Sequence, residues 1–182
     1  MEMAKTFDEI SGDVSKALRN FPDFPQAGIL FKDIMPILKN PKLTADLCLA
    51  IAKNYSNEGI TAVAGCEARG FLFGVQVAIH LNVPFVPIRK KGKLPGKCVS
   101  ASYLKEYGED IVEVQEDAFQ KGDKVLIIDD LLATGGTMNA AIQVIEKAGA
   151  FPTVAFCIIE LVDLKGKNVL PKSTRFESML KF

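Results

Sequence analysis

Four short apolar runs limit the fold of this chain more than any other feature of its sequence. The runs lie at residues 60–64, 84–88, 124–128 and 153–161, and helical apolar patterns follow the first and the third. A strand that is apolar along its whole length is buried on both faces, which is typical of parallel sheets covered by helices. The sequence therefore predicts an α/β fold with a central, mostly parallel sheet flanked by helices.

The remaining patterns predict helices early in the chain and a hairpin beyond its middle. Thr6 and Glu9 form a capping box ahead of an apolar helical stripe, and Asn40-Pro41 begins a second helix. The segment FPDFPQAGILFKDI at residues 21–34 holds two Phe-Pro pairs and a glycine, so we expect an extended loop there. Residues 100–115 alternate enough to predict two antiparallel strands around Tyr107-Gly108.

Length and charge exclude several classes of protein. The 182 residues fit a single domain, and 22 basic side chains balance 22 acidic ones, which argues against nucleic acid as a partner. No apolar run is long enough to span a bilayer, so we expect no membrane association. The four cysteines are scattered without a CxxC pair, and we expect reduced thiols in a cytoplasmic protein.

The single histidine narrows the chemistry. His80 ends the apolar run FGVQVAIHL, and we expect it to be a partly buried, structural residue. One histidine excludes histidine-based triads and multi-histidine metal sites. Any reaction must use carboxylates, basic groups, backbone amides or a metal ion brought by the substrate.

The segment VLIIDDLLATGGTM at residues 125–138 carries the clearest chemistry. An apolar strand runs into two acids, then into a turn with two glycines flanked by threonines, then into a helix. Glycines let a backbone approach an anion, and the amides at the start of a helix point towards it. Carboxylates accept hydrogen bonds from vicinal hydroxyls. The order of acids and then turn therefore predicts a site for a ribose 5-phosphate.

This segment also resembles the phosphoribosyl pyrophosphate (PRPP) motif of the type I phosphoribosyltransferase family. The blocks FPDFPQAGILFKDI, GCEARGFLFG, PIRKKGKLPG and ASYLKEYG resemble the adenine-specific members of that family, in the same order and over nearly the whole chain. The resemblance implies the type I phosphoribosyltransferase fold over residues 1–182, with a small N-terminal hood at about 1–35 and a flexible catalytic loop at about 92–110. It further implies purine salvage, in which a homodimer uses Mg2+ to convert PRPP and adenine into AMP and pyrophosphate.

The resemblance also assigns the residues that hold the sugar phosphate. The ribose hydroxyls would be bound by Asp129 and Asp130. The 5-phosphate would be held by the turn that follows, which consists of Ala133, Thr134, Gly135, Gly136 and Thr137.

For the leaving pyrophosphate, the resemblance assigns a loop and a basic run. The loop is GCEARG, in which Glu67, Ala68 and the catalytic Arg69 take part and a cis peptide joins Glu67 to Ala68. The run RKKGK would contribute Arg89, Lys90 and Lys93. Taken alone, such a run is typical of a solvated loop, but concentrated positive charge also suits pyrophosphate.

For the base and the proton, the resemblance assigns residues from three segments. Phe31 and Leu131 would sandwich adenine, and backbone groups of Leu30 and Lys32 would read its edge. Glu106 would handle the proton near N7, with Tyr107 beside it in the closing loop. No protein ligands are expected for Mg2+, which PRPP oxygens would mainly hold.

Three other functions remain open on the sequence alone. A phosphoribosyltransferase for hypoxanthine or guanine would differ only in the hood and the loop. A PRPP-sensing regulator would keep the motif but add basic surface or a DNA-binding domain. A non-enzymatic nucleotide-binding module would need neither Glu106 nor the basic run.

Overall fold

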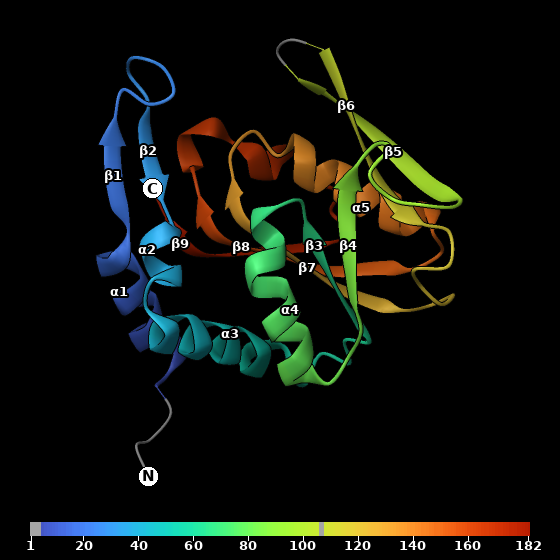
Figure 1. Cartoon of the computed structure of the whole chain (residues 1–182), viewed down its shortest axis with the longest axis horizontal. Helices are drawn as coiled ribbons and strands as arrows, with labels where there is room; N and C mark the ends of the chain where they lie inside the picture. Colours follow the sequence, from blue (N-terminus) through green and yellow to red (C-terminus); the bar gives the residue numbers. More distant parts are fainter. Residues whose placement is uncertain (1–4, 106–107) are drawn as a thin grey trace.

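The fold is organised around one mixed sheet, seen in a computed structural model that describes residues 5–105 and 108–182 (Figure 1). Within this described part, seven strands follow the order β5-β6-β4-β3-β7-β8-β9. The five strands β4, β3, β7, β8 and β9 run parallel to one another. Strand β6 is antiparallel to both β4 and β5. The prediction of a mostly parallel sheet is confirmed. The strands are β3 (Ala62–Cys66), β4 (Phe85–Lys90), β5 (Cys98–Lys105), β6 (Gly108–Gln115), β7 (Lys124–Leu132), β8 (Phe151–Glu160) and β9 (Arg175–Lys181).

Helices cover both faces of this sheet. One apolar cluster joins α1 (Phe7–Ala17), α3 (Pro41–Tyr55) and α4 (Arg69–Leu81) to the sheet, and a second joins α5 (Gly136–Lys147) to it. Along β7, Leu126 and Ile128 belong to the first cluster, whereas Val125 and Ile127 belong to the second. Side chains alternate between the faces of a strand. A strand covered on both sides must therefore be apolar throughout, which explains the continuous runs in the sequence.

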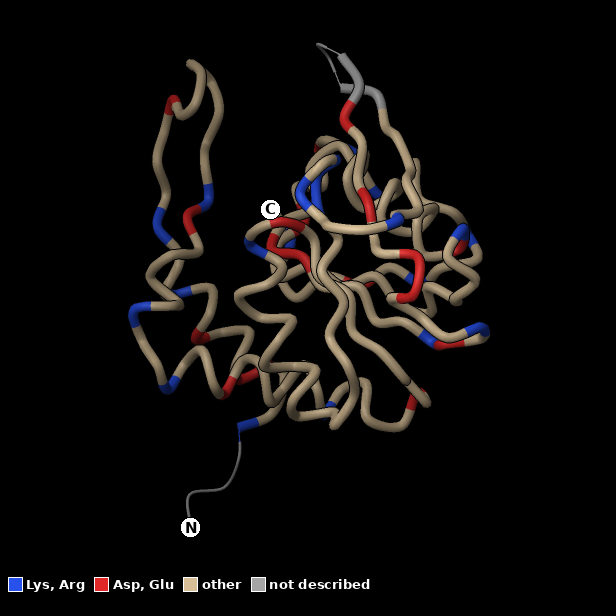
Figure 2. The backbone as a smooth tube through the Cα atoms, turned by 45° about the vertical axis from the view of Figure 1, so that its right-hand side comes forward, with Lys and Arg blue, Asp and Glu red and all other residues tan. Residues whose placement is uncertain are grey.

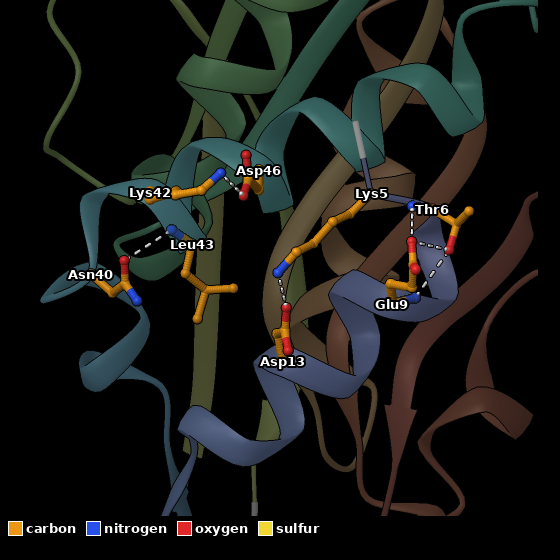
Figure 3. Close-up of polar contacts among 8 residues, drawn as sticks. All are labelled: Lys5, Thr6, Glu9, Asp13, Asn40, Lys42, Leu43 and Asp46. Atoms are coloured by element: carbon orange, nitrogen blue, oxygen red, sulfur yellow. Dashed lines mark hydrogen bonds and ion pairs between the residues drawn. The ribbon is translucent and has the colours of Figure 1, made fainter. Parts of the chain in front are cut away.

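The first two long helices begin at the caps that the sequence predicts (Figure 3). The Glu9 amide donates to Thr6 Oγ1 at 3.3 Å, and the Thr6 amide donates to Glu9 Oε2 at 2.8 Å, which completes the capping box. In α3 the Leu43 amide donates to Asn40 Oδ1 at 3.1 Å, ahead of Pro41 in the first turn. These caps satisfy amides that lack an acceptor within the helix.

The segment at residues 21–34 is not the extended loop that we expected. It lies largely in an antiparallel hairpin of β1 (Arg19–Pro22) and β2 (Leu30–Asp33), with Phe21 opposite Phe31, followed by the short helix α2 (Met35–Leu38). The Gly28 amide donates to Asp23 Oδ1 at 2.7 Å and closes the turn. Proline at the end of β1 is compatible with an edge strand, and the Phe-Pro pairs concealed this pattern.

The end of the chain also departs from the sequence interpretation, which stopped at the strand of residues 153–161. Two short 3-10 turns, η1 (Val162–Leu164) and η2 (Gly166–Val169), lead into β9, which extends the sheet beyond β8. Tyr55 Oη donates to Glu177 Oε2 at 2.7 Å and ties this strand to α3. His80 is exposed in the last turn of α4, so the expected partial burial was wrong.

Within the described ranges, no helix is both long and apolar enough to span a bilayer.

Candidate active site

The ends of β3 and β7 meet at one large cavity of about 810 Å³. In Figures 1 and 2 the β1–β2 and β5–β6 hairpins rise from the same side of the molecule, at opposite ends of it. The cavity walls come from the turn after β3, from β5 and from the whole segment after the middle of β7; they consist of Glu67, Ala68, Arg69, Tyr103 and residues 129–138. Two segments that are far apart in the sequence therefore share one pocket, because parallel strands end at one edge of the sheet.

The turn that follows β7 is shaped by its glycines. Gly135 has φ +86°, a left-handed conformation that favours glycine, and it precedes the first residue of α5. A Cβ atom added at Gly135 would lie 2.6 Å from Val169 Cγ2 and would overlap the carbonyl oxygen of Gly166. At Gly136 an added Cβ would lie 2.8 Å from Tyr103 Cδ2. The backbone therefore passes where side chains could not, and it presents the first amides of α5 at the cavity.

The paired acids at the end of β7 line the same cavity and are both buried. The Asp130 amide donates to Asp129 Oδ1 at 2.9 Å. Burial, and next the negative charge of Asp130, raise the pKa of the Asp129 carboxyl well above its usual range. Burying two neighbouring carboxyl groups costs free energy unless their oxygens accept hydrogen bonds. Hydroxyl groups of a ligand in the cavity would donate such hydrogen bonds.

Arg69 is the first residue of α4 and faces these acids. Its Nε atom lies 2.6 Å from Asp130 Oδ2, although the N–H is not aimed at that oxygen, so the contact is an ion pair rather than a hydrogen bond. The peptide between Glu67 and Ala68 is cis, as the family resemblance implied. The turn after β3 thus places a guanidinium opposite the acids at the end of β7.

The Glu67 carboxylate binds three donors from the basic run at residues 89–93. It accepts hydrogen bonds from Lys93 Nζ at 2.7 Å, from the Lys90 amide at 2.9 Å and from Arg89 Nη2 at 3.2 Å. Burial raises the pKa of Glu67, but these donors, led by Lys93, outweigh it and lower the pKa to about 2. Lys90 Nζ lies 3.8 Å from Asp110 Oδ2 on β6. The Glu67 carboxylate therefore holds two cationic side chains, those of Arg89 and Lys93, beside the cavity.

Comparison with known proteins places this geometry in a family. Residues 36–173 match the family described as "Phosphoribosyl transferase domain". The chain belongs to the phosphoribosyltransferase family. Adenine phosphoribosyltransferase of Caenorhabditis elegans is 55% identical over 167 residues, which cover 91% of this chain and 90% of the relative. That of Yersinia pestis (strain Pestoides F) is 47% identical over 154 residues, covering 85% of this chain and 82% of the relative.

Solved structures agree with the sequence relatives. Adenine phosphoribosyltransferase of Saccharomyces cerevisiae, complexed with an imino-altritol bisphosphate and adenine, has a TM-score of 0.89 at 40% identity, covering 94% of this chain and 99% of that one. The Giardia lamblia enzyme, complexed with 9-deazaadenine, has a TM-score of 0.87 at 38% identity, covering 94% and 97%. The resemblance to adenine-specific phosphoribosyltransferases is confirmed.

In this phosphoribosyltransferase, the residues predicted to hold the base are divided between the hairpin and the cavity. Leu131 lines the cavity, whereas Leu30, Phe31 and Lys32 lie on β2 and are not among the cavity-lining residues. The Phe31 ring packs edge-on against Phe24 with centroids 5.1 Å apart. Lys32 Nζ lies 4.0 Å from the centroid of the Phe182 ring, so the hairpin contacts the end of the chain. Of the three predicted catalytic residues, Arg69 lines the cavity, whereas Glu106 and Tyr107 lie outside the described residues.

Three residues that line the large cavity were not predicted as site residues, namely Tyr103, Leu132 and Met138, and only Tyr103 lies outside the segment after β7. Tyr103 lines the large cavity and also a smaller one of about 220 Å³, which reaches Cys66, Lys90 and Val112. Its block ASYLKEYG drew attention to Glu106 and Tyr107 instead. The alternation along β5 could have signalled a side chain directed at α5, but only with the sheet order known.

Proposed function

We propose that this protein transfers the phosphoribosyl group of PRPP to adenine, giving AMP and pyrophosphate in purine salvage. One observation carries the proposal: the buried acids at the end of β7 and the glycine turn after them line one cavity with Arg69. That arrangement suits a phosphorylated ribose with a departing anion. The C. elegans and Y. pestis relatives, which carry the name adenine phosphoribosyltransferase, support adenine as the acceptor.

The sugar phosphate is held by two kinds of group. The amides and threonine hydroxyls of the turn at residues 133–137 bind the 5-phosphate, since a helix start favours anions. Asp129 and Asp130 accept hydrogen bonds from the ribose hydroxyls. Fixing the ribose in this way orients its C1 atom for attack.

At C1 the bond to the pyrophosphate oxygen breaks and the bond to N9 of adenine forms. Positive charge develops on the ribose and negative charge on the leaving group. That negative charge is stabilised by Arg69, by Arg89 and Lys93, which both bind Glu67, and by Lys90, whose ammonium group lies near Asp110. Mg2+ would enter with PRPP, whose oxygens would mainly hold it, and it would neutralise phosphate charge.

The base side of the site uses the hood and the hairpin loop. Phe31 and Leu131 sandwich adenine, and the backbone of Leu30 and Lys32 reads its edge. Glu106, with Tyr107 beside it, accepts the proton that adenine loses as N9 attacks. The segment at about 92–110 closes over the substrates and excludes water.

We also propose that the protein is a homodimer in the cytoplasm. Leu72, Val75 and Ile79 form an exposed apolar stripe on α4, and Ile79 is 70% exposed. Their spacing places them on one helix face, opposite the buried Phe73 and Val77. A second copy of the chain would cover this stripe. The four free cysteines, of which Cys98 is partly exposed, suit a reducing compartment.

The test is a nucleotide-formation assay with PRPP and Mg2+ against adenine, hypoxanthine and guanine. We expect AMP formation to exceed formation of the other nucleotides and to stop when EDTA removes the metal. Turnover of hypoxanthine or guanine alone would favour the alternative purine specificity. Binding of PRPP without turnover of any base would favour a regulator.

A further inference from the structure

Tyr103 connects the phosphate turn to the β5–β6 hairpin through its hydroxyl. Thr137 Oγ1 donates a hydrogen bond to Tyr103 Oη at 3.1 Å, and Tyr103 Oη donates to Asp110 Oδ2 at 3.2 Å. Tyr103 and Asp110 are opposite each other in the β5–β6 register, whereas Thr137 is the second residue of α5. A continuous chain of donors and acceptors therefore runs from the turn into the hairpin.

The ring of Tyr103 is fitted to the turn as well. A Cβ atom at Gly136 would lie 2.8 Å from Tyr103 Cδ2 and 3.4 Å from Cε2. Gly136 does not have the positive φ of Gly135, so its conformation does not require glycine. Glycine is required at residue 136 because the Tyr103 ring leaves no room for a Cβ atom. Sterics and hydrogen bonding therefore independently place Tyr103 against the turn.

The hydroxyl of Thr137 has only one proton to donate. In this structure that proton goes to Tyr103. A phosphate oxygen is charged, and hydrogen bonds to charged acceptors are stronger than those between neutral groups. A phosphate in the turn would therefore take the Thr137 proton, and Tyr103 would lose this hydrogen bond from α5, whereas the bond from Lys147 Nζ at the other end of α5 to the Ser100 carbonyl would remain.

From these contacts we infer that Tyr103 is a positioning residue, which transmits occupation of the phosphate turn to the hairpin. The inference deepens the proposed function and rests on it, since it requires a 5-phosphate at residues 133–137. In the sequence, Glu106, the residue proposed to handle the proton, lies between the end of β5 and the start of β6. Asp110 also lies 3.8 Å from Lys90 Nζ, so the link extends to the basic run.

Amide hydrogen exchange of residues 98–103 and 110–115 tests the inference, with AMP and adenosine as probes that differ only in the 5-phosphate. AMP should change exchange in the wild-type hairpin, and adenosine should change it less. In Tyr103→Phe, which keeps the ring and loses the hydroxyl, this phosphate-specific change should fall about 2- to 10-fold, the equivalent of one hydrogen bond. AMP affinity should stay within about threefold of wild type, while kcat falls by about 2- to 10-fold.

Tyr55→Phe is the matched control, because it also removes a tyrosine hydroxyl that donates to a carboxylate. That carboxylate belongs to Glu177, which does not line the cavity. Tyr55→Phe should retain the wild-type hairpin response and kcat. An unchanged AMP response in Tyr103→Phe, or no hairpin response in wild-type protein that binds AMP, would overturn the inference and leave the proposed function standing. Wild-type protein that binds neither AMP nor PRPP would instead overturn the proposed function, and the inference with it.

Discussion

Replacing Glu67 with glutamine should destabilise the protein in a pH-dependent way. Glu67 holds Lys93, Arg89 and the Lys90 amide, and its pKa falls from an ordinary value of 4.5 to about 2. A shift of that size corresponds to about 3.4 kcal/mol of stability as an upper bound. The side chains of Lys93 and Arg89 are 47% and 33% exposed, so solvent screening reduces the expected loss to about 1–2 kcal/mol.

The sign of the pH dependence follows from the depressed pKa. The stabilisation is present above pH 4.5, and it is lost as the pH falls towards the folded pKa of about 2. Urea unfolding at pH 7 should show the full gap between wild type and Glu67→Gln, and the gap should narrow steadily below pH 4.5. At pH 7 the Tm should fall by roughly 2–8 °C.

Glu116→Gln is the control for this experiment, since Glu116 is an exposed carboxylate. It should leave both stability and its pH dependence near those of the wild type. An equal loss for Glu67→Gln at pH 7 and at pH 3 would show that the carboxylate charge is not what holds the basic run. No loss at either pH would refute the reasoning altogether.

Three further changes test the site. Gly135→Ala forces a side chain into a left-handed backbone against Val169, so urea unfolding should show a loss of about 2–5 kcal/mol, and wild-type stability would contradict the close approach. Asp129→Asn replaces a carboxyl group whose pKa is raised by burial, so the free energy of unfolding at pH 7 should not fall. The value of kcat/KM for PRPP should drop about 10- to 100-fold, and unchanged kinetics would remove Asp129 from the ribose site. Glu106→Gln should lower kcat about 10²–10⁴-fold with PRPP affinity nearly unchanged, and equal turnover would exclude Glu106 from proton transfer.

Much of the architecture could be predicted because local chemistry and burial agree. The runs that became β3, β4, β7 and β8 are apolar on both faces, and the caps at Thr6 and Asn40 have side chains that satisfy helix amides. The order of acids, glycines and helix after β7 likewise predicts one cavity wall, because each feature is local to the chain.

The parts that escaped prediction depend on contacts between distant residues. The Phe-Pro pairs concealed the β1–β2 hairpin, whose pairing of Arg19 with Asp33 appears only after folding. The approach of Gly166 to the phosphate turn joins residues about thirty positions apart. The basic run was predicted to face pyrophosphate, but nothing in its sequence shows that Arg89 and Lys93 donate hydrogen bonds to Glu67. Tyr103 was missed for the same reason, since its partner Thr137 lies on another element.

The most direct measurement is a crystal structure of the AMP complex. The account predicts the 5-phosphate against the amides of residues 134–137, with the ribose hydroxyls donating to Asp129 and Asp130. If AMP left that turn vacant and its phosphate occupied another part of the surface, the central assignment would be contradicted.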